Sequence, residues 1–191
     1  MELIPLIQIK NRKIQREQKY TQYELNFDNL KEIYILDLDG IEKNKPNLCT
    51  YQKLTKKTEL WIDSGPRNEG DIVDNLMAGA EKITIRKNTW PNVDITHITE
   101  ITENPIYLEI KIQEINNINI QNLENELYNG IIIINTENTD ENAILYSNYI
   151  KKITLKFNIY YYDKNPTNQQ LLEKIGIKGL LIDIDKMAEQ T

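Results

Sequence analysis

Eight short hydrophobic runs recur along the chain, and most of them end in polar residues. They are rich in β-branched residues, which is typical of strands buried on both faces of a parallel sheet. Their starts lie 22 to 29 residues apart, leaving room for one helix and two short loops between successive strands. We predict strands over residues 4–10, 33–37, 59–63, 82–86, 106–112, 130–135, 157–162 and 179–184.

Several intervening segments have helical patterns. Residues 68–79 begin with a capping asparagine, place four apolar side chains on one face and end at a glycine. Asn165-Pro166 is predicted to open another helix, and residues 121–128 and 140–150 are further candidates. The polar segment after the first strand predicts a hairpin or loop, with a short helix near residues 26–32.

Regular alternation of strands and helices indicates a parallel sheet, and eight such units favour a closed (βα)8 barrel. We predict one barrel domain over residues 1–191, with trimmed helices because barrels of this kind are usually longer. Matches at offsets of about 100 residues indicate that the second half-barrel repeats the first. These matches pair residues 63–68 with 163–168, Gln8 with Glu109, and Asp37 with Asn135.

The composition excludes several classes of partner and of metal site. The net charge of -6 argues against nucleic acid or an anionic membrane as a partner, because phosphates repel an acidic surface. One cysteine and one histidine exclude an internal disulfide and a histidine-rich metal site. No apolar run is long enough to span a membrane, and no signal peptide is evident, so we predict a cytoplasmic protein.

Three motifs resemble the barrels of histidine biosynthesis: Ile4-Pro5, the Leu-Asp-Leu-Asp-Gly of residues 36–40, and the Ser-Gly-Pro-Arg-Asn of residues 64–68. The chain is most similar to the phosphoribosylformimino-aminoimidazole-carboxamide ribotide isomerase family and its archaeal relatives, most specifically over residues 33–88. The resemblance implies a ribulose-phosphate-binding-barrel fold. It also implies an aldose-to-ketose isomerisation of an aminated sugar phosphate, with two aspartates as general base and acid.

The chain departs from this family at the catalytic pair. The first-strand acid is replaced by Gln8, whose amide cannot transfer a proton near neutral pH. Glu109 stands at the fifth-strand position, so the parental pair is broken. We therefore treat Glu109, together with the carboxylates that end or follow hydrophobic runs, as catalytic candidates and expect them at the mouth of the barrel. They are Glu109, Asp37, Asp63 and Asp163.

The family also implies two phosphate sites built at strand ends. The loops after the seventh and eighth strands here contain acids and no glycine, and acids repel phosphate. The segment after the third and fourth strands is better preserved, and the alternative for it is a capped helix with a solvated basic pair. Its candidate phosphate-binding residues are Ser64, Gly65, Arg67 and Arg86.

The mouth carries more acids than bases, and two interpretations stay open. Crowded carboxylates bind a divalent cation or an amine, or they form a salt-bridged rim with Lys10, Lys111 and Lys164. The sequence has no dinucleotide-binding glycine pattern and no specific metal motif. We predict no cofactor, with a divalent cation as the alternative.

The leading hypothesis is a divergent isomerase-like barrel that binds a small metabolite, phosphorylated or not, at its mouth. If it is an enzyme, it performs an aldose–ketose step or a different lyase or isomerase step. The alternatives are a non-catalytic binding or assembly subunit and an active aminoaldose-phosphate isomerase. A homo-oligomer is compatible with each.

Overall fold

The computed structural model describes residues 1–16, 25, 27, 30–117, 120, 123, 127–135, 145–163 and 169–187. Its strands form one sheet of order β2-β1-β3-β4-β5-β6-β7-β8-β9, in which β1 also pairs with β9. Eight strands are parallel and alternate with helices, so the chain folds as the (βα)8 barrel that the sequence predicts.

All eight predicted strands are confirmed, with ends shifted by no more than two residues. Six of them bury every residue or all but one, while β1 and β5 are buried mainly over their central and later residues, which explains the hydrophobic runs. The strands are β1 (Glu2–Lys10), β3 (Glu32–Asp37), β4 (Glu59–Asp63), β5 (Ala80–Arg86), β6 (Ile106–Lys111), β7 (Gly130–Asn135), β8 (Ile159–Asp163) and β9 (Gly179–Asp183).

The predicted hairpin is also confirmed, because β2 (Lys13–Gln15) turns back antiparallel to β1. The helix expected at residues 68–79 is α3, and the Asn68 side chain caps it. The short helix expected near residues 26–32 and those expected at 121–128, at 140–150 and from Asn165 fall wholly or partly outside the described residues. The described helices are α1 (Leu38–Lys43), α2 (Leu48–Leu54), α3 (Glu69–Met77), α4 (Ile95–Ile101), the 3-10 helix η2 (Ile112–Asn117), α7 (Ser147–Thr154), α8 (Gln169–Lys174) and α9 (Ile184–Met187).

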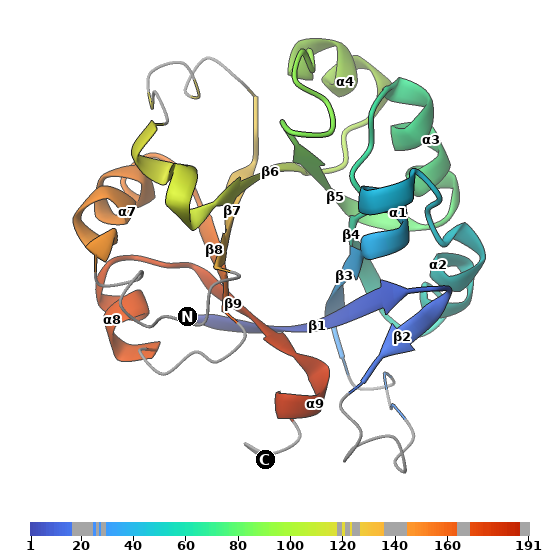
Figure 1. The fold of residues 1–191 in the computed structure, drawn as a ribbon, viewed down its shortest axis with the longest axis horizontal. Coiled ribbons are helices and arrows are strands. Elements are labelled where there is room, and N and C mark those ends of the chain that lie inside the picture. The colour runs from blue at the N-terminus through green and yellow to red at the C-terminus, as the bar shows by residue number, and fades with distance from the viewer. Residues whose placement is uncertain are drawn as a thin grey trace. The chain divides into compact units, whose positions relative to one another are not determined.

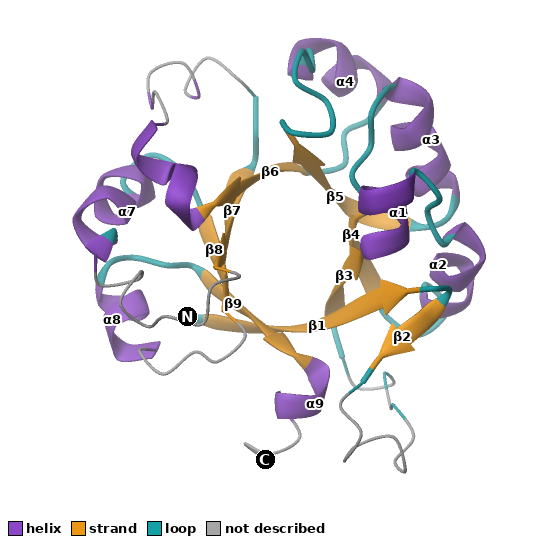
Figure 2. Ribbon diagram, in the orientation of Figure 1, coloured by secondary structure: helices purple, strands orange, loops and turns teal. Residues whose placement is uncertain are grey.

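The chain divides into two compact units. The β1–β5 unit comprises Ile4–Val93 and the described residues from Asp183 onward, and the β6–β9 unit comprises Met1–Leu3 and Asp94–Ile182. Within the β1–β5 unit, α2 and α3 lie outside the strands, and α1 follows directly from the end of β3 (Figures 1 and 2). The single-domain organisation stays a prediction.

A buried aromatic pair fills one face of the sheet in the β1–β5 unit. Tyr34 and Trp61 are both fully buried and meet edge to face, with their ring centroids 5.4 Å apart. The Trp61 indole N–H donates to the Thr84 hydroxyl at 3.0 Å, so the polar atom of this large side chain is satisfied. The same face carries Gln8 and Asp63, which are described below.

None of the helices in the described part of the chain is both long and apolar enough to cross a membrane.

Candidate functional site

The register of the strands decides which side chains share a face at the carboxyl ends of the β1–β5 unit. Gln8 lies opposite Leu36, and Leu36 lies opposite Asp63. Neighbouring residues in register point to the same side of a sheet, so Gln8 and Asp63 share one face. Asp37 follows Leu36 directly and points to the other face, the one that packs against the helices.

Asp63 is held in a buried ion pair. Its side chain is 0% exposed, and the Arg86 guanidinium donates from Nε to Oδ1 at 2.8 Å and from Nη2 to Oδ2 at 2.6 Å. The Tyr34 hydroxyl donates to Oδ2 at 2.7 Å. Burial, followed by the negative charge of Asp63, raises the pKa of Tyr34 well above its ordinary value, so its hydroxyl stays a donor.

Asp37 joins the starts of two helices. Its carboxylate accepts from the Asp39 and Gly40 amides at 3.0 and 3.2 Å and so caps α1. It also accepts from the Asn47 amide at 2.7 Å, from the Asn47 side chain at 2.8 Å and from the Tyr51 hydroxyl. Burial and the charge of Asp37 raise the pKa of Tyr51, which keeps that donor protonated. The expectation that Asp37 faces the mouth together with Asp63 is therefore wrong.

Asp39 fastens the β1–β2 hairpin to α1. Its carboxylate accepts from the Arg12 amide at 2.9 Å, from Lys43 Nζ at 2.9 Å and from the Asn47 side chain at 3.2 Å. The Arg12 N–H, followed by Lys43, lowers the pKa of Asp39 well below its ordinary value.

Lowering the pH should therefore destabilise the folded protein, partly because the Asp39 carboxylate becomes protonated. In the folded protein the pKa of Asp39 lies below its unfolded value of about 3.9. The contribution of Asp39 to the free energy of unfolding is therefore complete when the pH is above the unfolded pKa, and it is lost as the pH falls toward the folded pKa. We expect urea titrations between about pH 5 and about pH 2 to show a smaller fall in unfolding free energy for Asp39→Asn than for the native chain. Equal falls in the two proteins would contradict this role.

Arg67 clamps the β4–α3 loop to α1. Its guanidinium donates to the carbonyl oxygens of Gly40, Ile41 and Gly65 at 3.1, 2.8 and 3.1 Å. It also donates to the Asn44 side chain at 2.7 Å. These donors already point at protein oxygens, so the described contacts of Arg67 are structural.

Ser64 and Gly65 are packed closely in the same loop. The Ser64 hydroxyl and the Asn75 side-chain amide are hydrogen-bonded at 2.9 Å. Gly65 has a φ of +64°, and an added Cβ would lie 3.1 Å from the Ile41 Cα atom. Phosphate binding by Ser64, Gly65, Arg67 and Arg86 stays a prediction, and the geometry gives each of them a structural contact.

The candidate acids of the β6–β9 unit fall on opposite faces. Asn135 lies in register with Asp163 and donates to its Oδ2 atom at 2.9 Å. Glu109 lies in register with Ile132, three residues before Asn135 on β7, so Glu109 and Asp163 are on different faces. The catalytic roles of both stay predictions.

The second acid of the proposed repeat is displaced. In the first half Leu36 lies opposite Asp63, whereas in the second half Ile134 lies opposite Tyr162. Relative to the strand before it, Asp163 is therefore one residue out of step with Asp63. Matching the two aspartates at an offset of 100 residues is wrong for their side chains.

Ion pairs surround the strand ends of the β1–β5 unit. Lys43 pairs with Asp39 at 2.9 Å, and Lys10 pairs with Glu42 at 3.3 Å. Arg16 pairs with Asp185 at 2.7 Å. These contacts favour the salt-bridged rim over a metal-cation site. Of the three lysines predicted to form that rim, only Lys10 takes part in these ion pairs. The described residues contain no cluster of three or more His, Cys, Asp or Glu that could hold a metal ion.

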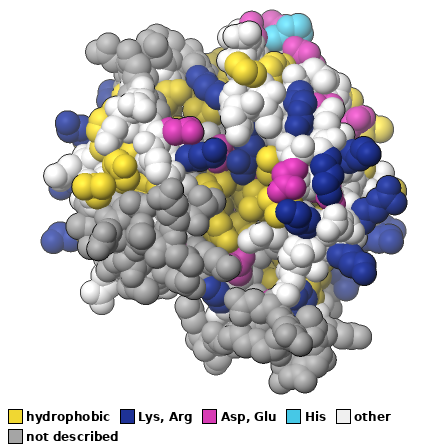
Figure 3. Space-filling view, in the orientation of Figure 1, with side chains coloured by type: hydrophobic (Ala, Val, Ile, Leu, Met, Phe, Trp, Pro, Cys, Tyr) yellow, Lys and Arg dark blue, Asp and Glu magenta, His cyan; other side chains and the backbone are white. Residues whose placement is uncertain are grey.

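A cavity of about 410 Å³ opens beside this rim. Arg12, Lys43 and Lys45 line it, together with Asp39 and Asn47. Lys and Arg side chains gather over α1 and the β1–β2 hairpin in Figure 3. The sequence predicts only a hairpin or loop for the segment after the first strand and gives no sign of this basic cavity, because Arg12 comes together with Lys43 and Lys45 only in the folded chain.

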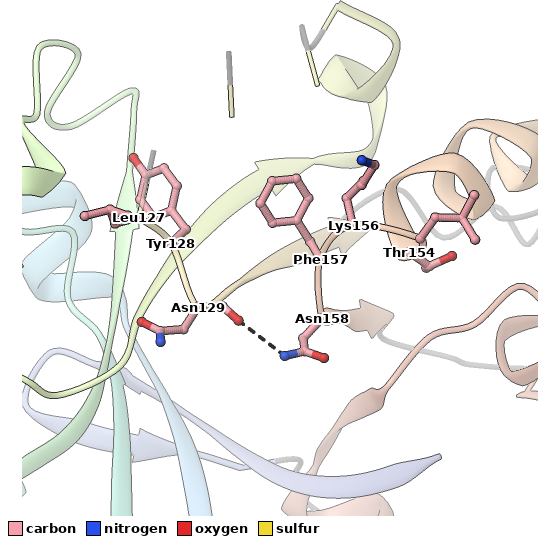
Figure 4. A pocket seen from close by; sticks show the side chains of 8 residues that line it. Leu127, Tyr128, Asn129, Thr154, Lys156, Phe157 and Asn158 are labelled. Carbon is pink, nitrogen blue, oxygen red and sulfur yellow. Dashed lines mark hydrogen bonds between the residues drawn. The ribbon is translucent and has the colours of Figure 1, made fainter. Parts of the chain in front are cut away.

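A second cavity, of about 540 Å³, lies in the β6–β9 unit. Residues 127–129 and 154–158 line it, just before β7 and β8 begin (Figure 4). The Asn158 side chain donates to the Asn129 carbonyl at 3.4 Å across it. Barrel enzymes carry their reactions at the opposite, carboxyl ends of the strands, so this cavity is a poor candidate for a reaction site.

The fold and the polar strand ends define the class of this chain: a (βα)8 barrel with its candidate site at the carboxyl ends of the strands. Among solved structures it is similar to a Yersinia pestis DHPS with a pterine-sulfa conjugate, with a TM-score of 0.64 and 10% sequence identity. The match covers 98% of this chain and 89% of that chain. At this identity the likeness shows the fold alone. No family model and no curated protein matches the sequence.

Proposed function

We propose that this chain is a divergent barrel protein related to the ribotide isomerases of histidine biosynthesis. It binds a small metabolite, phosphorylated or not, at the carboxyl ends of its strands and no longer performs the parental isomerisation. One observation carries the proposal: Gln8 lies near the carboxyl end of β1, in register with Leu36 of β3 and, one strand further, on the same face as Asp63 of β4. An amide at this position leaves β1 without a proton carrier.

Asp63 is a carboxylate on that face, and its contacts do not suit a general base. Three hydrogen bonds, two from Arg86 and one from Tyr34, already occupy its two oxygens. Because Asp63 is paired with Arg86 and held by three donors, we do not assign to it the proton transfer that Gln8 cannot perform.

The same arrangement suits binding. The Gln8 amide is half-buried, and the buried Asp63–Arg86 pair joins the ends of β4 and β5 on the same face. A fixed ion pair and a neutral amide on the same face of the sheet are groups with which a small polar ligand can be oriented by hydrogen bonds.

Turnover is the first test. We expect no conversion of the family's aminoaldose ribotide by the purified protein, because the pair of acids that would move the proton is incomplete. The measurement is substrate consumption followed by absorbance and chromatography over long incubations. Turnover that disappears in Glu109→Gln would overturn the proposal.

Binding is the second test. A thermal-shift screen with sugar phosphates, divalent cations and amines should find a ligand that raises the unfolding midpoint. Gln8→Ala should weaken the binding of that ligand about tenfold, as expected for loss of a buried hydrogen bond. Gln52→Ala, the same change on the exposed face of α2, should leave binding unaltered. No response to any of the three classes would refute the binding proposal and favour the assembly subunit.

A further inference from the structure

The turn between β1 and β2 contains an unusual arginine. Asn11 and Arg12 join the two strands, with φ angles of +52° and +63°, and Lys10 pairs with Lys13 across the turn. Two successive residues of positive φ define the type I′ hairpin turn, whose second position strongly favours glycine. Asparagine adopts this conformation readily, but an arginine is strained there.

The contacts that fix this turn do not use the Arg12 side chain. The Arg12 backbone N–H donates to Asp39 Oδ2 at 2.9 Å. Lys43 Nζ binds Asp39 Oδ1 at 2.9 Å and Asn11 Oδ1 at 3.1 Å. A glycine would keep that N–H and remove the strain, so the guanidinium is what the arginine adds.

The guanidinium belongs to the basic cavity of about 410 Å³ described above. Arg12, Lys43 and Lys45 contribute three positive charges to its lining, and Asp39 contributes one negative charge. Both oxygens of Asp39 are engaged by the turn and α1. Within the described part of the chain, the side chains of Arg12 and Lys45 form no ion pair and are exposed. This basic surface stands out on an acidic chain of net charge -6 (Figure 3).

We propose that this cavity binds a phosphate dianion, either free or as the phosphate group of a small metabolite. The planar Arg12 guanidinium offers paired N–H donors that match phosphate oxygens, and Lys43 and Lys45 supply flanking charge. A strained residue that is not required by its own turn is a common mark of a functional position. The site is separate from the Gln8 face, so it does not depend on the function proposed above.

Calorimetric titration tests this site with two probes, inorganic phosphate and ribose 5-phosphate, at low and constant ionic strength. We expect the native protein to bind at least one of them with a dissociation constant in the millimolar range or tighter. Tighter binding of ribose 5-phosphate would identify an esterified phosphate as the ligand, and tighter binding of inorganic phosphate the free ion. Binding should weaken as salt is added, because the cavity is open to solvent.

Arg12→Gly is the decisive variant, because it should lower affinity about tenfold or more while its unfolding midpoint stays equal to or above that of the native protein. Lys56→Ala removes a positive charge from an exposed position after α2 and should bind phosphate as the native protein does. Three results would overturn the proposal: no binding to the native protein, unchanged affinity in Arg12→Gly, or an equal loss of affinity in Lys56→Ala.

Discussion

Replacing Arg86 with methionine should lower the free energy of unfolding by about 3–5 kcal/mol, the usual cost of removing one partner from a buried ion pair. The Asp63 carboxylate is fully buried, and Arg86 itself is only 6% exposed. Methionine fills much of the space of the arginine stem but provides no donor, which would leave Tyr34 as the only donor among those described above for Asp63. Urea titration followed by tryptophan fluorescence measures the change, since Trp61 lies on the same face.

A double variant separates the charge from the packing. Asp63→Leu combined with Arg86→Met removes both charges, and it should recover a large part of the stability that Arg86→Met alone loses. A single variant that costs less than about 1 kcal/mol would show that the pair is solvated rather than buried. A double variant that costs as much as both single changes added together would show that the two side chains act independently.

The sequence predicted where the strands lie but not which way their last residues point. A strand buried on both faces gives a continuous apolar run. The position of the strand is then evident from the sequence, but the face to which each side chain points is not. Asp37 and Asp63 both end such runs, and only the register, which pairs Leu36 with Asp63, separates their faces. The same limit explains why Asp63 and Asp163 match in sequence but differ by one residue in register with the strand before them.

Helices α1 and α2 were missed for a different reason. Asp39-Gly40 is typical of a turn, yet here it forms the first turn of α1. Gly40 is required because an added Cβ would lie 2.5 Å from the Ser64 carbonyl oxygen. Arg67 was likewise read as a phosphate ligand, because its carbonyl acceptors on α1 come from a part of the chain more than twenty residues away. Contacts of this kind leave no local pattern.

Replacing Asp37 with asparagine should lower the free energy of unfolding by about 3 kcal/mol or more. Five donors converge on this carboxylate: two amides of α1, the amide and side chain of Asn47, and the Tyr51 hydroxyl. An asparagine has nearly the same shape but presents an NH₂ group in place of one oxygen. At least one buried donor would then face another donor, and the cap of α1 would weaken as well.

Tyr51→Phe is the matched comparison, because it removes one of the five donors and leaves the carboxylate in place. It should cost about 1–1.5 kcal/mol in the same urea titration, the net contribution of one hydrogen bond. If Asp37→Asn costs no more than Tyr51→Phe, the carboxylate does not organise the two helices, and Asp37 would regain its standing as a catalytic candidate. If the larger cost is found, any effect of Asp37 substitutions on ligand binding has to be assigned to the folding of α1 and α2 rather than to chemistry.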